Sequence, residues 1–80
     1  MLAEKNELSI LQEFARSIKL RRILREWTQQ EASDRMGICT NYLQRLERGV
    51  ANPSLTTIIS ILQAFDITFP QLLKIQVKET

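Results

Sequence analysis

Polar side chains that suit the edges of DNA bases are concentrated in one short stretch of the sequence. The set comprises Thr40, Asn41, Gln44, Arg45 and Arg48. In a helix, at about 100° per residue, all of them fall within roughly 140° of one another. Arginine can donate two hydrogen bonds to guanine, asparagine or glutamine can match adenine, and a threonine methyl can contact the thymine methyl. This face is therefore predicted to read base edges; the alternative is a solvent-exposed face without a partner.

The opposite face of the same stretch is apolar. Tyr42, Leu43 and Leu46 fall at roughly 200°, 300° and 240° on the helix wheel when Thr40 is placed at zero. A helix with one apolar and one polar face packs its apolar side on a core. These three side chains are therefore predicted to attach the helix to the rest of the domain.

Positive charge is concentrated in the middle of the chain. Residues 14–52 hold eight basic and four acidic side chains, a net charge of +4, whereas residues 1–13 carry −2 and residues 53–80 carry zero, which together give the overall +2. A local basic surface of this size is compatible with a polyanion as partner. On charge alone, a solvated surface without a partner is equally acceptable.

The sequence contains few residues that could serve in catalysis or bind a metal or a cofactor. It has no histidine and one cysteine, Cys39, which leaves no internal disulfide and no zinc site of the usual Cys/His kind. The nearest carboxylate pair, Glu31 and Asp34, fits a solvated helix face on which Glu31 pairs with Arg35. We therefore expect no catalytic residue, no metal and no cofactor. Redox sensing by Cys39 is an alternative to a structural role.

Length and hydropathy indicate one small domain outside the membrane. Eighty residues with a hydrophobic share of 44% form a single core. No apolar run approaches the length that spans a bilayer, and the N-terminal MLAEKNELS carries acids where a secretory signal has basic residues. We expect a cytoplasmic protein.

Apolar spacing and capping residues predict an all-α chain. The first helix is expected from about Ser9 to Arg25, because apolar side chains recur there at spacings of three and four. Thr28 and Glu31 form a capping box that opens a second helix, which Gly37 ends. This second helix is short, roughly two turns.

Three more helices follow in the second half of the chain. The third begins at Cys39 or Thr40 and ends near Arg48, before Gly49. Ser54 caps the fourth, whose expected core face consists of Leu55, Ile58, Ile59, Leu62 and Phe65. Thr68 with Gln71 opens a last short helix through about Ile75.

The stretch TQQEASDRMGICTNYLQRLERGVANPSLTTI resembles the helix-turn-helix of the Cro/cI-type, or Xre-type, repressor family. The resemblance covers about residues 14–73 and includes the Thr-Gln opening, the Gly37 turn, the Leu43/Leu46 pair, Glu47, Gly49 and Asn-Pro-Ser-Leu. It implies a compact five-helix, lambda-repressor-like DNA-binding domain with the helix-turn-helix at helices two and three. Small proteins of this length also resemble controller proteins of restriction-modification operons.

The resemblance assigns roles to individual residues. The implied DNA-binding residues are Thr28, Gln29, Thr40, Asn41, Gln44, Arg45, Arg48 and Asn52. Gln29 matches a phosphate-binding position at the start of helix two, where free N–H groups favour an anion. Thr40, Asn41, Gln44 and Arg45 match base-facing positions, with Arg48 and Asn52 near the backbone.

Three further features of the resemblance concern the scaffold. Arg22 and Glu47 match positions that form an ion pair between helices one and three in some relatives; the alternative is two independent surface charges. Glu26 stands where relatives have glycine, so either the first helix ends differently or Glu26 adopts a left-handed conformation. Cys39 stands where a Ser or Thr cap is common, which makes Thr40 an alternative cap.

The domain plan is an N-terminal extension at residues 1–13, partly helical, a helix-turn-helix domain at 14–75 and a C-terminal tail at 76–80. Relatives pair about a two-fold axis, and the last helix has more apolar residues than its own core contact needs. We therefore expect a homodimer interface at Phe69, Leu72, Leu73 and Ile75. The alternatives are that these residues extend the core of one chain, or that the N-terminal extension wraps the partner.

The function expected is that of a sequence-specific transcriptional regulator that binds a two-fold-symmetric operator in double-stranded DNA as a homodimer. The competing class is an antitoxin-like protein-interaction module that binds a protein partner and uses its helix-turn-helix for autoregulation.

Overall fold

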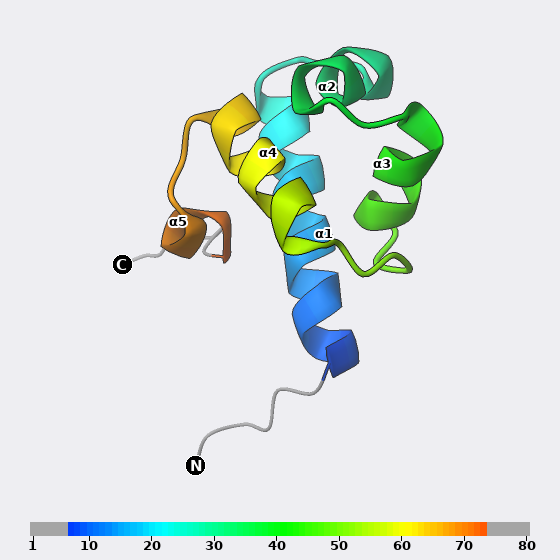
Figure 1. Cartoon of the computed structure of the whole chain (residues 1–80), viewed down its shortest axis with the longest axis vertical. Helices are drawn as coiled ribbons and strands as arrows, with labels where there is room; N and C mark the ends of the chain where they lie inside the picture. The colour runs from blue at the N-terminus through cyan, green and yellow to red at the C-terminus, as the bar shows by residue number, and fades with distance from the viewer. Residues whose placement is uncertain (1–6, 74–80) are drawn as a thin grey trace.

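The computed structural model describes residues 7–73, which form five α-helices (Figure 1). These are α1 (Glu7–Leu24), α2 (Gln29–Met36), α3 (Thr40–Glu47), α4 (Leu55–Phe65) and α5 (Phe69–Leu73). No strand occurs among residues 7–73. The expected all-α, five-helix architecture is confirmed. Because α1 begins at Glu7, it includes the second half of the segment expected as an N-terminal extension; Ile75 and the tail at 76–80 lie outside the described residues.

Hydroxyl side chains begin the second, fourth and fifth helices. Thr28 Oγ1 accepts from the Glu31 N–H at 3.0 Å while the Glu31 carboxylate accepts from the Thr28 N–H at 2.8 Å, the capping box expected from the sequence. Ser54 Oγ accepts from the Thr57 N–H at 3.1 Å. Cys39 occupies the cap position of α3 without a side-chain hydrogen bond, so α3 is held at its start by other contacts.

The first four helices end in the same way. A residue with positive φ follows each one, and the N–H after it donates back to the carbonyl five positions earlier, as Trp27 does to Arg22 at 3.2 Å. The four left-handed residues are Glu26, Gly37, Gly49 and Asp66, with φ of 58°, 72°, 76° and 58°. Glu26 therefore takes the left-handed conformation in place of the glycine of relatives, which costs about 1–2 kcal/mol.

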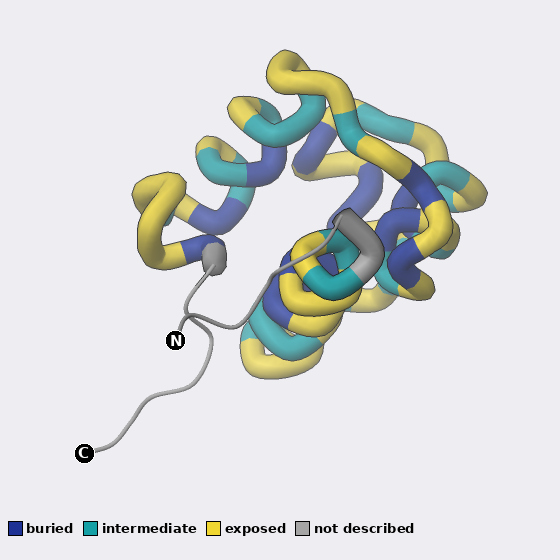
Figure 2. Tube along the Cα trace, turned by 90° about the horizontal axis from the view of Figure 1, so that it is seen from below, coloured by how far each residue is buried: buried dark blue, intermediate teal, exposed yellow. Residues whose placement is uncertain are grey.

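One core holds the helices together, and α1, the longest of the described helices, packs against both α3 and α5. Figure 2 shows the buried segments facing one another across the interior, with exposed segments on the outside. The buried cluster consists of Phe14, Ile18, Ala32, Met36, Leu43, Leu46, Ala51, Ile61, Phe65 and Leu72. Trp27 packs at its edge, stacked on Phe65 with ring centroids 5.6 Å apart.

The expected core face of α4 was wrong in part. Phe65 is buried, but Leu55 and Ile59 are 71% and 46% exposed, and the deeply buried partner of Phe65 is Ile61. Most of α4 is apolar, so helical spacing could not decide which side packs on α2. The helix therefore buries one apolar side and leaves Leu55 and Ile59 on the surface.

Leu72 also needs correction as a residue of a dimer interface. It has no exposed surface and lies in the core cluster, so its side chain is already covered within one chain. Phe69, by contrast, is 47% exposed. The side chain of Leu73 and all of Ile75 lie outside what the structure describes.

Candidate nucleic-acid interface

The start of α3 is fixed to α2 by hydroxyl and amide groups. Ser33 is fully buried; its Oγ donates to the Gln30 carbonyl at 3.0 Å and lies 3.0 Å from Thr40 Oγ1. Thr40 Oγ1 donates in turn to the side-chain oxygen of Gln30 at 3.1 Å. Because Thr40 is half-buried and its hydroxyl is held by α2, it positions α3 where Cys39 supplies no cap.

An ion pair between α1 and α3 lies at the centre of the site. Arg22 Nε donates to Glu47 Oε2 at 2.7 Å and Arg22 Nη2 donates to Glu47 Oε1 at 3.1 Å, a bidentate contact. The side chains are only 12% and 3% exposed. A third Arg22 nitrogen, Nη1, donates to the Trp27 carbonyl at 3.0 Å. The expected ion pair is confirmed, and two independent surface charges are excluded.

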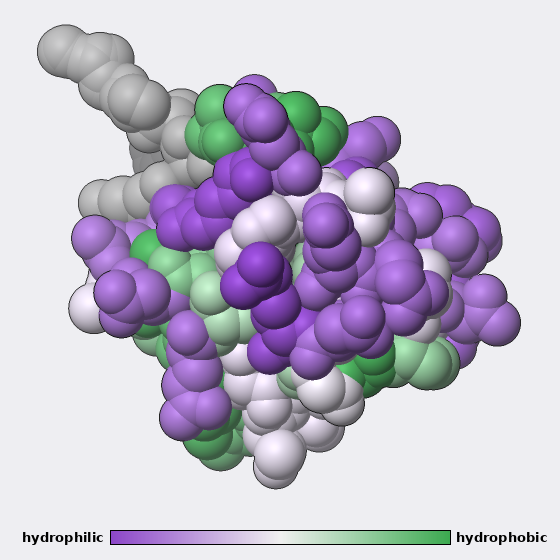
Figure 3. Space-filling view, turned by 90° about the horizontal axis from the view of Figure 1, so that it is seen from above, coloured by the Kyte–Doolittle hydropathy of each residue, from purple (hydrophilic) through white to green (hydrophobic). Residues whose placement is uncertain are grey.

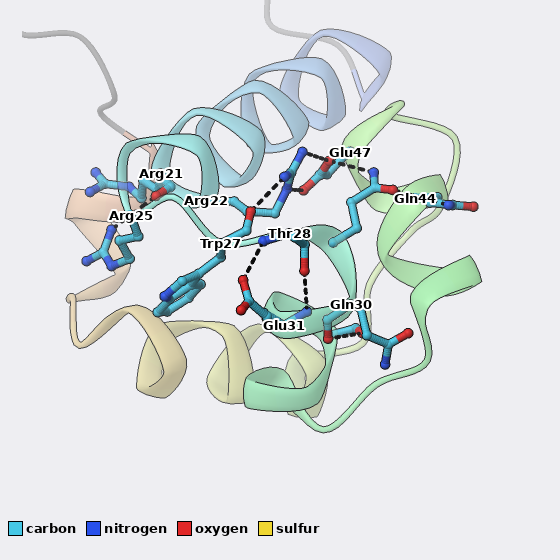
Figure 4. Close-up of polar contacts among 11 residues, drawn as sticks. Arg21, Arg22, Arg25, Trp27, Thr28, Gln30, Glu31, Gln44 and Glu47 are labelled. Atoms are coloured by element: carbon cyan, nitrogen blue, oxygen red, sulfur yellow. Dashed lines mark hydrogen bonds and ion pairs between the residues drawn. The ribbon is translucent and has the colours of Figure 1, made fainter.

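Two amides extend this ion pair to α2 and back to α3 (Figure 4). Gln29 Nε2 donates to Glu47 Oε1 at 3.2 Å, and Gln44 Nε2 donates to Gln29 Oε1 at 3.2 Å. These hydrogen bonds therefore form a connected series from Arg22 on α1 through Glu47 and Gln29 to Gln44. Because these hydrogen bonds link all three helices, they hold α2 and α3 in one orientation relative to each other and to α1.

The predicted DNA-binding residues differ in how far they reach solvent. Thr28, Asn41, Arg45, Arg48 and Asn52 are exposed, whereas Gln29, Thr40 and Gln44 are half-buried. Hydrophilic side chains cover most of the face seen from the α2 side in Figure 3. Within the base-facing set, Asn41 and Arg45 are thus the exposed members, while Thr40 and Gln44 are hydrogen-bonded to α2.

Lys19 was not among the DNA-binding residues predicted from the sequence. Lys19 is an exposed residue of α1 that lines a polar hollow of about 260 Å³ together with Gln29, Gln44, Glu47 and Arg48. It precedes Arg22 by three residues, so the two lie on neighbouring parts of one helix surface. The three-residue spacing from Arg22 was the only sequence signal that could have indicated Lys19. It indicates a site residue only if Arg22 is already known to face α3.

Much of the basic charge of residues 14–52 has a structural use instead. Arg25 Nη2 donates to the Phe65 carbonyl at 2.8 Å, and Arg21 Nη2 donates to the Gln71 carbonyl. Burial, with the neighbouring charge of Arg25, lowers the pKa of Arg21. The guanidinium of Arg35 lies over the Trp27 ring, 4.5 Å from its centroid. These three guanidinium groups keep their positive charge, but part of their contact capacity is used within the chain.

The contacts of Glu31 and Arg35 differ from the pair expected between them. Glu31 serves the capping box of α2, and Arg35 stacks on an aromatic ring. Among residues 7–73, no group of three or more His, Cys, Asp or Glu side chains could hold a metal ion. In the same part of the chain, no helix combines the length and the apolar character that crossing a membrane requires.

The fold and the exposed polar face of α3 define a helix-turn-helix DNA-binding domain, with α2 and α3 as its two helices. A family model described as Helix-turn-helix, of the Xre or Cro/cI type, matches residues 18–72, well over half of the chain. The chain belongs to this family of DNA-binding transcription regulators.

Solved structures of regulators are similar to the chain. The restriction-modification controller protein C.AhdI from Aeromonas hydrophila is 28% identical, with a TM-score of 0.73 over 80% of this chain and 96% of that one. The hypothetical transcription factor NHTF from Neisseria is 25% identical, with a TM-score of 0.76 over 92% and 86%. The clp gene regulator ClgR from C. glutamicum, 21% identical with a TM-score of 0.76 over 90% of both chains, shares the fold. No curated protein matches the chain.

The buried ion pair generates a stability prediction. Arg22→Met is expected to cost about 3 kcal/mol or more, because it leaves the Glu47 carboxylate buried and unpaired. The double variant Arg22→Met, Glu47→Met removes both charges and is expected to be more stable than the single variant. Urea unfolding followed by circular dichroism measures both. A single-variant cost below about 1 kcal/mol, the range of an exposed pair, would contradict this account.

Proposed function

We propose that this protein is a sequence-specific transcriptional regulator that occupies a two-fold-symmetric DNA operator as a homodimer. The observation that carries the proposal is the combination of a buried Arg22–Glu47 pair with an exposed polar face on α3. Reading a base sequence needs side chains held in a fixed register on a rigid element. The ion pair supplies the rigidity, and the exposed face supplies the readers.

Base reading is assigned to Asn41 and Arg45. They stand four residues apart on α3, so they share one side of the helix, and both are exposed. Arg45 suits the O6 and N7 acceptors of guanine, and Asn41 suits the N6 donor and N7 acceptor of adenine. Thr40 and Gln44 belonged to the base-facing set expected from the resemblance. Since α2 holds both of their side chains, we assign them to positioning.

Contacts to the DNA backbone are assigned to Thr28, Gln29, Arg48 and Asn52. Thr28 and Gln29 stand at the start of α2, where the positive end of the helix dipole favours a phosphate. Arg48 and Asn52 follow the end of α3 and are exposed. Such contacts fix the register of the protein on the duplex without reading sequence.

This division of roles predicts different effects for Arg45 and Gln29. Arg45→Ala is expected to cost about 1–3 kcal/mol at the preferred site and to relax the preference at one base position. Gln29→Ala is expected to weaken preferred and random duplexes by similar factors, since a phosphate contact carries no sequence information. Selection of binding sites from a random duplex pool, followed by affinity measurements, separates the two. If both substitutions weakened every sequence equally, Arg45 would not be a base reader.

A dimer is proposed because one helix-turn-helix reads only a few base pairs. The last two described helices, α4 and α5, expose Leu55, Ile59 and Phe69, at 71%, 46% and 47% exposure. Leu55 and Ile59 lie on one side of α4, and Phe69 begins α5. Phe69 also lines an apolar hollow of about 180 Å³ between α1, α4 and the loop that precedes α4. We assign this surface to the second copy, with Leu72 removed from the interface and Leu73 and Ile75 retained from the sequence-based expectation.

Charged substitutions test the assigned interface. Phe69→Lys is expected to shift the protein to monomers and to weaken binding to a two-half-site duplex by at least about tenfold, because a lysine would be desolvated in a dimer contact. Leu24→Lys is the matched control, since Leu24 is an exposed leucine at the end of α1. Sedimentation equilibrium gives the assembly state. A wild-type monomer, or an unchanged Phe69→Lys dimer, would refute the assignment.

A further inference from the structure

The polar hollow beside α3 is built from three helices. Lys19 comes from α1, Gln29 from α2, and Gln44 and Glu47 from α3, with Arg48 directly after it. Its volume is about 260 Å³, enough for a group of the size of a phosphate. In the sequence, the last part of α1 and the turn before α2 separate Lys19 from Gln29. Lys19 therefore lies beside the residues of the helix-turn-helix only because of the fold.

The charges of the hollow favour an anion. Lys19 and Arg48 are exposed, and no hydrogen bond or ion pair within residues 7–73 engages either side-chain charge. The one carboxylate in the lining, Glu47, is neutralised by the bidentate contact from Arg22 and is 3% exposed. The hollow therefore carries two available positive charges and no available negative one.

The amide groups of the hollow are arranged as donors. Gln29 Nε2 donates one N–H to Glu47, and Gln44 Nε2 donates one N–H to the Gln29 side-chain oxygen. An amide nitrogen has two N–H groups, so each glutamine has one left. The Gln29 oxygen is already used as an acceptor. Donors from two amides and two cations, without a competing free carboxylate, suit the oxygens of a phosphodiester.

We propose that this hollow holds one backbone phosphate of DNA and that Lys19 is a phosphate contact supplied by α1, outside the helix-turn-helix. This inference rests on the proposed function and extends it to Lys19, a residue that the family pattern did not assign, and it places Lys19 in one donor set with Gln29, Gln44 and Arg48. Gln44 then has two roles: one amide N–H positions α3 through its bond to Gln29, and the other N–H donates to the phosphate. The contact adds affinity for every sequence and sets the angle at which α3 enters the groove.

Salt dependence tests the proposal, with a random-sequence duplex and a duplex selected by the wild-type protein as probes. Lys19→Gln is expected to lower the slope of log Kobs against log salt by about 0.9 per protomer, and to weaken both duplexes by a similar factor. Arg35→Gln is the matched control, because it removes one positive charge beside Trp27, which lies away from Gln44 and Glu47 in Figure 4. The control slope is expected to change less than that of Lys19→Gln.

The outcomes separate this proposal from the function on which it rests. If the wild-type protein binds and Lys19→Gln keeps its slope and affinity, the phosphate contact is refuted while the proposed function stands. The same holds if Lys19→Gln and Arg35→Gln lower the slope equally, since only net charge would then matter. If the wild-type protein binds neither duplex, the proposed function fails and the phosphate contact fails with it.

Discussion

The arrangement of the site depends on one buried carboxylate. The Glu47 side chain is only 3% exposed, and a buried carboxylate left without a partner would cost several kcal/mol. It is satisfied only when Arg22 of α1 and Gln29 of α2 both reach it, at 2.7 and 3.2 Å from its oxygens. Three helices must therefore take one relative arrangement to satisfy one side chain. Leucines at positions 43 and 46 add the apolar contact, but the ion pair defines the angle at which α3 presents Asn41 and Arg45.

The first helix connects the proposed DNA-binding surface with the proposed dimer surface. Arg22 holds α3, and one residue earlier Arg21 donates to the Gln71 carbonyl of α5. Ser17, fully buried, donates to the Leu72 carbonyl and accepts from Arg21 Nε at 3.3 Å. The short helix α5, which carries Phe69, is thus bonded to α1, the same helix that holds the recognition helix α3. In a two-fold dimer, such a link fixes the spacing of the two recognition helices, which must match half-sites about one helical turn apart.

Local sequence signals predicted the helices well, because caps and turns depend on neighbours in the chain. Thr28 with Glu31, and glycine at 37 and 49, mark their helix ends as expected. The resemblance also predicted the Arg22–Glu47 pair. Features set by packing between helices were not predictable. The buried side of α4 could not be chosen in a largely apolar helix, and the contacts that hold Thr40 and Gln44 to α2 depend on the fold. The position of Lys19 in the site was not predictable either, because it too depends on how α1 packs against α2 and α3.

The most direct test of the account is a titration of the purified protein onto the DNA upstream of its own coding sequence and onto a scrambled duplex of equal length, at two salt concentrations. The account predicts tight binding of one dimer per site to the upstream fragment, with only weak, strongly salt-sensitive binding to the scrambled duplex. Equal and weak binding to both duplexes would contradict it, and would favour a protein-interaction module that requires a partner for its function.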